Sequence, residues 1–202
     1  MPQKNQKTGR KPPLSPEQIS VIRTLLSQKS QIKNSVRDLA LFSLAIDSGL
    51  RGIDLVHIRV SDISEGDGSI KERASILQQK TSSPVTFSIM PFTRVALKDL
   101  IEQEYKYYGD YLFTPQQRKT GKPISTTYYR KLVKEWVSLA GLNPDLYGSH
   151  SLRRSKVSLV YKKTGNLRAA QVLLGHKSIQ STAGYLGIET DEALTIAEQF
   201  KV

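Results

Sequence analysis

The segment Gly148 to Lys156 (GSHSLRRSK) carries side chains suited to holding a phosphate group. His150 stands three residues before Arg153, and the turn before them and the apolar run after them indicate the start of a helix. Side chains three apart share a helix face, and the first turn of a helix offers unpaired N–H groups to an anion. An imidazole and a guanidinium placed there can each contact one phosphate oxygen. By itself the H-x-x-R pattern is common, and a capping histidine beside a surface arginine is the default explanation.

Three other segments carry residue types that complement this pair. In SGLRGIDL, Arg51 follows a helix-ending glycine, and Asp54 three residues later is placed to orient its guanidinium. In LLGHKSIQSTAGY, His176 follows a glycine turn, and a short predicted helix leads to Tyr185 nine residues further on. Between these segments, Lys80 lies at the tip of a predicted β-hairpin.

Taken in order, these residues resemble the tyrosine recombinase (phage integrase) family. The family pattern is an arginine, a lysine on a β-hairpin, His-x-x-Arg, a histidine or tryptophan, and then a nucleophilic tyrosine. The resemblance covers roughly residues 15–200 and rests on SGLRGIDL, QQKTSS, HSLRRS, LLGHKSI and STAGYLG. Six ordered matches are far more specific than any one of them. The resemblance implies a catalytic site made of Arg51, Lys80, His150, Arg153, His176 and Tyr185.

The resemblance implies metal-independent cleavage of duplex DNA, with no nucleotide cofactor. Tyr185 would attack the phosphorus and form a 3′-phosphotyrosine link, which conserves the bond energy without ATP. Arg51 and Arg153 would stabilise the charge on the non-bridging oxygens, because guanidinium offers planar, paired donors and stays charged. The products of the step would be the covalent adduct and a free 5′ hydroxyl.

Proton transfer needs further groups, since a phenol titrates near pH 10. His150 would accept the tyrosine proton as general base, and His176 would donate to a non-bridging oxygen. Lys80 would protonate the departing 5′ oxygen, the role that the family implies for its hairpin lysine. Lys71 and Lys98 are rivals for that position, and we favour Lys80 because it precedes a turn between two strands.

Composition agrees with a nucleic-acid partner. The 202 residues include 30 Lys and Arg against 18 Asp and Glu, a net charge of +12, which is typical of polyanion-binding proteins. A basic ribosomal or RNA-binding protein would explain the charge but not the ordered motifs. The absence of cysteine excludes disulfides, thiolate zinc sites and a cysteine nucleophile. No apolar run approaches a membrane span, so we expect a cytoplasmic, nucleoid-associated protein.

Periodicity predicts a mainly α fold with a small antiparallel β-hairpin (α+β), which the resemblance makes a tyrosine recombinase catalytic domain. Residues 1–14 read as a basic disordered arm, and residues 15–202 as the catalytic domain. A helix should begin after Ser15, and a short one should follow Arg51. The hairpin should occupy 73–90, and the other helices about 33–48, 92–105, 125–140, 150–163, 167–174, 178–184 and 190–200.

Most family members carry a separate N-terminal helical domain that grips the far side of the DNA. Here only the arm and one or two helices precede Arg51, so we expect a stand-alone catalytic domain or a fragment of a longer protein. An auxiliary DNA-bending protein is a candidate partner. Two other functions fit the same fold: a catalytically idle DNA-binding regulator, and DNA relaxation like that of a type IB topoisomerase.

The last segment, 188–202, has an acidic start and apolar residues at helical spacing. Such a helix can pack on its own core or dock into a neighbouring protomer. The family couples its active sites by such docking in a cyclic tetramer on DNA. We favour docking and therefore expect a homo-tetramer on DNA.

Overall fold

A computed structural model describes residues 11–28, 35–115, 121–187 and 198. Within these ranges the chain is mostly helical, with a two-stranded antiparallel sheet in which Arg73 pairs with Ser88 and Leu77 with Pro84. The elements, in chain order, are α1 (Pro16–Gln28), α2 (Ser35–Ser48), α3 (Gly52–Val56), α4 (Val60–Ile63), β1 (Arg73–Leu77), β2 (Pro84–Ser88), α5 (Pro91–Gln103), α6 (Thr126–Leu139), α7 (Ser149–Thr164), α8 (Leu167–Leu174) and α9 (Ile179–Leu186).

The predicted fold class is confirmed, and the two strands fall inside the predicted hairpin. Helix α4 was not predicted, because four residues give too short a window for a helical period to show. The predicted helix at 190–200 lies outside the described residues except for Glu198, and so do residues 1–10 of the predicted arm. From Lys11 onward the chain packs on the domain, and Leu14 is buried.

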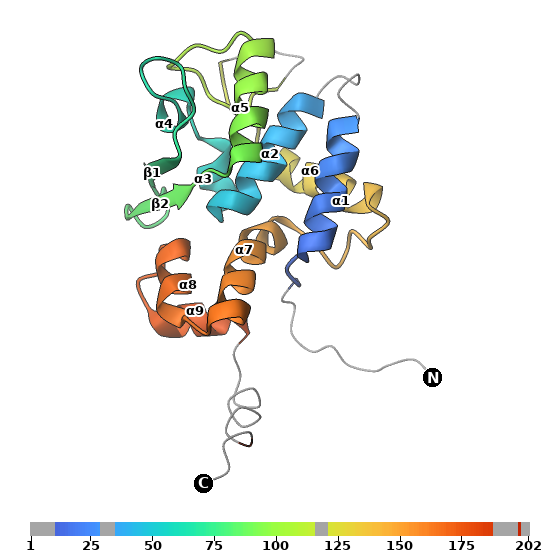
Figure 1. Ribbon diagram of the computed structural model, residues 1–202, viewed down its shortest axis with the longest axis vertical. Helices are drawn as coiled ribbons and strands as arrows, with labels where there is room; N and C mark the ends of the chain where they lie inside the picture. The colour runs from blue at the N-terminus through green and yellow to red at the C-terminus, as the bar shows by residue number, and fades with distance from the viewer. Residues whose placement is uncertain (1–10, 29–34, 116–120, 188–197, 199–202) are drawn as a thin grey trace.

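Helix α2 is the central element of the larger part of the fold. It contacts α1, α5 and α7, and most of its residues are buried (Figure 1). A helix that is buried on nearly all sides needs neighbours that cover it all round, and α2 has them. The main core also takes in α3, α6 and the inner face of the hairpin. Gly49 ends α2 with a φ of +58°, a conformation that favours glycine, and so sends the chain toward Arg51.

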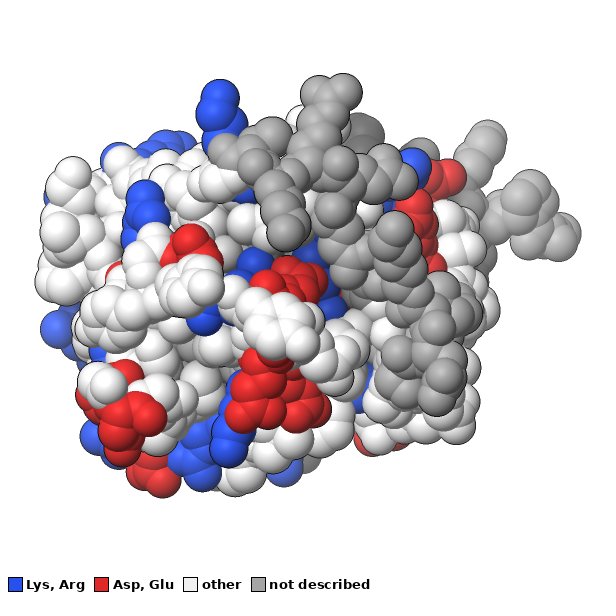
Figure 2. Space-filling model, turned by 90° about the horizontal axis from the view of Figure 1, so that it is seen from above, with Lys and Arg blue, Asp and Glu red and all other residues white. Residues whose placement is uncertain are grey.

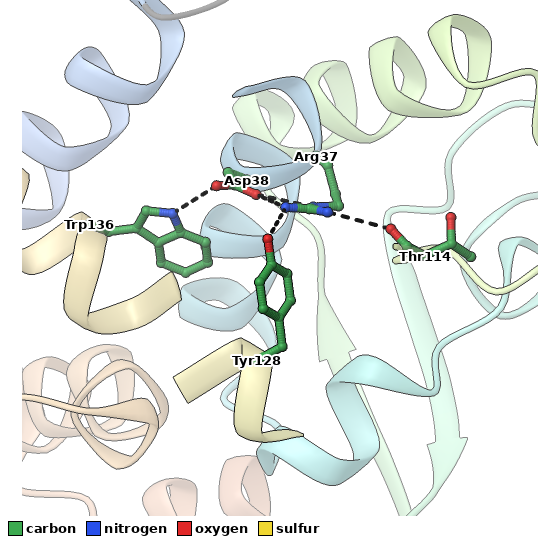
Figure 3. A network of polar contacts seen from close by, with 5 residues as sticks. All are labelled: Arg37, Asp38, Thr114, Tyr128 and Trp136. Atoms are coloured by element: carbon green, nitrogen blue, oxygen red, sulfur yellow. Dashed lines mark hydrogen bonds and ion pairs between the residues drawn. The ribbon is translucent and has the colours of Figure 1, made fainter. Parts of the chain in front are cut away.

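A buried arginine joins α2 to α6 (Figure 3). The Arg37 side chain is 2% exposed and pairs with the carboxylate of Asp38 at 2.8 Å. Its guanidinium also donates to the Tyr128 hydroxyl and to the Thr114 carbonyl. The other oxygen of Asp38 accepts from the indole N–H of Trp136 at 3.2 Å. This network fixes α6, which carries part of the wall of the candidate site, against the central helix.

Replacing Asp38 with alanine should lower the free energy of unfolding by about 3 kcal/mol, because Arg37 would stay buried without its counter-charge. Urea unfolding followed by circular dichroism measures this. The matched control is Glu102→Ala, which breaks an exposed pair with Lys98 and should cost less than about 0.5 kcal/mol. Equal effects of the two substitutions would contradict a structural role for the Arg37 network.

Helices α7, α8 and α9 form a smaller layer beside the main core, at the lower end of Figure 1. A second apolar cluster holds them together, with Val157, Ala170 and Leu174 buried and Tyr185 and Leu186 packed against them. The sequence of α7 is polar, yet it buries Ser151, Ser155 and Ser158, small residues that allow close approach. None of the described helices has the length and apolar character needed to cross a bilayer.

Candidate active site

Arg153 lies where the two layers meet. Arg153 is 4% exposed. Its guanidinium donates one hydrogen bond to the carbonyl of Gly49, at the end of α2, and another, of 2.9 Å, to the carbonyl of Leu174, at the end of α8. Nη2 also lies 3.5 Å from Nε2 of His176. The first turn of α7 therefore holds together the segments that carry Arg51 and His176. Burial lowers the pKa of Arg153 to about 10, so the guanidinium is still charged at neutral pH.

Three of the predicted residues line one cavity of about 230 Å³. Arg51 precedes α3 with an extended backbone, and its side chain reaches this cavity, while His150 and Arg153 enter it from α7. The remaining lining residues are Gly52, Ile53, Thr126, Tyr129, Arg130 and Ser149. Two guanidinium groups and an imidazole around a space of this size suit a phosphate.

Asp54 contacts the hairpin and not Arg51. Its Oδ1 accepts a hydrogen bond from the backbone N–H of Gln79 at 2.8 Å, and Nη1 of Arg51 is buried without a hydrogen-bond partner among the described residues. The sequence suggested an Arg51–Asp54 contact because the two stand three apart. Arg51 precedes α3 with an extended backbone, so helical spacing does not place its side chain next to that of Asp54, and the carboxylate binds the β1–β2 connection instead.

Lys80 is exposed in the connection between β1 and β2, as predicted, but no contact joins it to the other five candidates within the described chain. The base of its loop is fixed, because Gln78 donates to the Leu174 carbonyl and Gln79 to Asp54. The two rival lysines are engaged elsewhere. Lys71 donates to the carbonyls of Ser61 and Asp62, and Lys98 pairs with Glu102 on α5. Lys80 therefore remains the candidate whose side chain extends from the hairpin.

Tyr185 and His176 lie together beside Arg153. Their rings meet edge to face with centroids 5.4 Å apart, and the Tyr185 hydroxyl donates to the backbone carbonyl of His150 at 3.4 Å. The phenol thus reaches the residue that lines the cavity, although it contacts that residue's carbonyl and not its imidazole. Gly175, the residue before His176, ends α8 with a φ of +61° and packs closely on β2. A Cβ at this position would lie 2.3 Å from a methyl carbon of Val85, so the turn that leads to His176 requires glycine.

The hydrogen bonds around His176 determine which of its ring nitrogens carries the hydrogen when the imidazole is neutral. Nε2 faces the Arg153 guanidinium, which can only donate, so Nδ1 carries the hydrogen and donates to the Thr182 hydroxyl at 3.2 Å. Thr182 in turn donates to the Ser178 carbonyl. Burial and the charges of Arg153 and Arg51 lower the pKa of His176 to about 4.

Stability should consequently fall as pH is lowered from 7 to 5. The unfolded chain binds a proton at His176 near pH 6.5, whereas the folded chain resists protonation until about pH 4, so acid favours the unfolded state in that interval. Above about pH 6.5 the imidazole is neutral in both states and contributes no slope. Urea midpoints measured across this range should show a shallower pH dependence for His176→Gln than for wild type. An unchanged slope would mean that another group takes up the proton.

Positive charge is concentrated at this site. Partial desolvation and then the charges of Arg153, Arg154, Arg130 and Arg51 lower the pKa of His150. The end of the molecule that carries α4 and α5, seen in Figure 2, instead shows acidic and basic side chains next to each other. At the site, four guanidinium groups act on the single imidazole of His150.

Two arginines near the site were not predicted to belong to it. Arg130 lines the cavity from α6, and nothing in the sequence of that helix distinguishes it from a surface arginine. Arg154 is 8% exposed and lies over the Tyr185 ring, with Cζ 4.6 Å from the centroid. Its adjacency to Arg153 is the one signal that the sequence offers, but adjacent helix positions point about 100° apart, so the position alone does not place Arg154 at the site.

The fold and this arrangement of side chains define a tyrosine recombinase catalytic domain. The chain belongs to the phage integrase family, whose family model matches residues 14–192.

Curated relatives agree with this family. The chain is 25% identical over 171 residues to the tyrosine recombinase XerH of Campylobacter jejuni, covering 83% of this chain and 46% of that protein. It is 27% identical to the probable integrase/recombinase YoeC of Bacillus subtilis over 87% of this chain and 88% of the relative. The chain thus spans about half the length of XerH and most of YoeC.

Solved structures show the same fold. A XerH site-specific recombinase bound to a palindromic difH substrate, in a post-cleavage complex, superposes with a TM-score of 0.73 at 22% identity. The alignment covers 96% of this chain and 55% of that one. A lambda integrase dimer bound to a COC′ core site gives a TM-score of 0.63 at 20% identity, covering 90% of this chain and 49% of that one.

Proposed function

We propose that this protein is a site-specific DNA recombinase, which cleaves and rejoins duplex DNA through a 3′-phosphotyrosine intermediate in integration, excision or inversion. The observation that carries the proposal is the position of the Tyr185 hydroxyl, 3.4 Å from the backbone of His150, which with Arg51 and Arg153 lines a cationic cavity. A phenol placed beside a phosphate-sized cationic cavity is what in-line attack on a phosphodiester requires.

In the proposed step the Tyr185 oxygen forms a bond to phosphorus, and the bond from phosphorus to the 5′ oxygen breaks. Arg51 and Arg153 hold the non-bridging oxygens and neutralise the charge of the pentacoordinate transition state. The lowered pKa of His150 keeps its imidazole neutral at pH 7, so the ring is available to accept the phenol proton. Lys80 donates a proton to the leaving 5′ oxygen, and the exposed hairpin turn gives its stem the reach for this.

His176 has a positioning part in the same step. Its ring packs edge to face against Tyr185, and its Nε2 lies within reach of the Arg153 guanidinium. When a phosphate enters the cavity, its negative charge favours protonation of the ring, which then donates to a non-bridging oxygen. The reverse of this chemistry, attack of a 5′ hydroxyl on the phosphotyrosine, rejoins the strand and restores the enzyme.

The proposal includes the assembly. Two rounds of strand exchange between two duplexes need four active sites, so the acting form is a homo-tetramer on DNA, associated with the nucleoid. Residues 188–202 dock each protomer onto its neighbour, and an auxiliary DNA-bending protein is a further partner. Among similar proteins, XerH and lambda integrase have been seen bound to DNA, the latter as a dimer.

The test uses duplexes tiled from the DNA that flanks the gene, nicked so that the cut strand diffuses away and the adduct accumulates. Incubation without metal and a denaturing gel should show protein attached to the 3′ side of one labelled strand. Two intact duplexes should then yield exchanged products. An adduct with relaxation of supercoiled DNA but no exchange would indicate topoisomerase-like activity, and binding without an adduct would indicate a regulator.

A further inference from the structure

Arg154 is buried in contact with the proposed nucleophile. Its guanidinium lies closer to the Tyr185 ring than that of Arg153 does, at 4.6 Å against 5.9 Å from Cζ to the ring centroid. No carboxylate pairs with Arg154 in the described part of the chain, and its Nε is buried without a hydrogen-bond partner there. Removing a guanidinium from water costs free energy unless its surroundings compensate the charge. The electron-rich face of the Tyr185 ring supplies part of that compensation through a cation–π contact.

Arg154 also contacts the N-terminal segment of the described chain. Its Nη1 donates to the Lys11 carbonyl at 3.1 Å, which brings together residues 143 positions apart. The Arg154 side chain therefore spans from the start of the described chain to the ring of Tyr185.

The segment that carries this carbonyl, residues 11–14, is fastened to the rest of the domain at both of its ends. The Lys11 ammonium donates to the carbonyls of Asp145 and Tyr147, at 3.1 and 2.7 Å, in the loop before α7. The backbone N–H of Leu14 donates to the Ser155 hydroxyl at 2.9 Å, on α7 itself. Residues 11–14 are thus fastened across the N-terminal end of α7, with one carbonyl directed at Arg154.

We propose that Arg154 is a positioning residue for Tyr185, held against the ring by the Lys11 carbonyl, and that it favours loss of the phenol proton. The proposal rests on the proposed function, in which Tyr185 is the nucleophile. Arg153 faces the cavity and the phosphate, whereas Arg154 faces the ring and the N-terminal segment.

The electrostatics agree with this geometry. Burial raises the pKa of Tyr185, and the positive charges of Arg153 and Arg154 oppose that rise. Within the described parts of the chain, the groups that face the phenol are these two arginines from α7, the imidazole of His176 from the turn before α9, and the carbonyl of His150. Because no carboxylate is among them, removing one guanidinium should weaken the stabilisation of the phenolate directly.

The first measurement needs no DNA. Tyrosine labelled with ¹³C at Cζ reports each phenol in the full chain, and Tyr185→Phe identifies the Tyr185 signal. In Arg154→Gln the Tyr185 signal should titrate at higher pH than in wild type, and in Arg154→Lys it should stay close to wild type because the charge is kept. An unchanged titration in the folded Arg154→Gln variant would overturn the proposal.

Lys11→Ala provides a second variant in case Arg154→Gln does not fold. It removes the two hydrogen bonds that fasten the segment and leaves Arg154 in place. The Tyr185 signal should move in the same direction by a smaller amount. If it does not move, the Lys11 carbonyl does not hold Arg154, and that part of the proposal is wrong.

The second measurement is the single-turnover rate of adduct formation on the nicked duplex at saturating protein. Arg154→Gln should slow it on the order of tenfold, with DNA affinity within about twofold of wild type, and Arg154→Lys should recover part of the rate. The matched control is Arg94→Gln, at a partly exposed arginine on α5 that pairs with Glu72. A loss of affinity with an unchanged rate would make Arg154 a DNA contact and overturn the proposal. If wild type forms no adduct but the titration shifts as expected, the proposed function fails while the positioning role of Arg154 stands.

Discussion

Replacing Tyr185 with phenylalanine should abolish covalent attachment to DNA while leaving DNA binding within about twofold of wild type. The substitution removes one oxygen and keeps the ring, which packs on His176 and lies beneath Arg154. The hydroxyl donates a long hydrogen bond to the His150 carbonyl, and the Arg153 and Arg154 guanidinium groups interact with its oxygen, so both arginines keep their other contacts when the oxygen is removed. Without the hydroxyl no atom remains to attack the phosphorus, and the adduct should fall by at least about three orders of magnitude.

A labelled nicked duplex and a denaturing gel measure the adduct, and a gel-shift titration measures binding. The matched control is Tyr161→Phe, a tyrosine on α7 outside the Tyr185–His176 pair, which should form the adduct at the wild-type rate. Adduct that persists in Tyr185→Phe would place the nucleophile at another residue. Lost binding in that variant would mean that the phenol contributes to the complex as well as to the chemistry.

Replacing Arg153 with lysine should have the second largest effect, a loss of about 10²–10³ in the rate of adduct formation. The guanidinium donates hydrogen bonds to two carbonyls, those of Gly49 and Leu174. It also lines the cavity and lies beside Nε2 of His176. An ammonium group keeps the charge but has no planar fork, so it cannot hold this geometry and also present paired donors to a phosphate.

The same change should lower the free energy of unfolding by about 1–3 kcal/mol, because a buried carbonyl loses its donor. Rates must therefore be compared at a temperature where circular dichroism shows both proteins folded. Arg94→Lys is the control, since a lysine at that partly exposed position can keep the ion pair with Glu72. An adduct rate within threefold of wild type in Arg153→Lys would show that charge alone suffices at this position.

The two variants separate the two functions of the site. Tyr185→Phe removes the attacking atom and leaves the cationic cavity unchanged, whereas Arg153→Lys leaves the attacking atom and alters the cavity. Binding of the duplex should therefore survive the first substitution fully and weaken modestly in the second. The His176 titration reports on the same guanidinium from the other side, because Arg153 is among the charges that lower that pKa.

The sequence by itself determined the family, the fold class and most of the secondary structure. Helix caps and apolar periods are local signals, and so α7 and α8 fall within a residue of their predicted bounds. The order of the six motif positions is also a property of the chain alone. Since it does not depend on how the segments pack, it was enough to indicate the family, and the family model over residues 14–192 confirms that family.

Only the tertiary structure decided which side chains face one another. Asp54 and Arg51 are three residues apart, yet the Asp54 carboxylate binds the hairpin backbone and not Arg51. The Arg154 guanidinium, in contrast, donates a hydrogen bond to the backbone carbonyl of Lys11, 143 positions away. Spacing along a helix fixes the direction of a side chain relative to its own axis, but its partner depends on which segment packs there. Arg153 reaches Gly49 and Leu174 because α2 and α8 both end beside α7, and burial there, with the neighbouring charges, sets the pKa of His176.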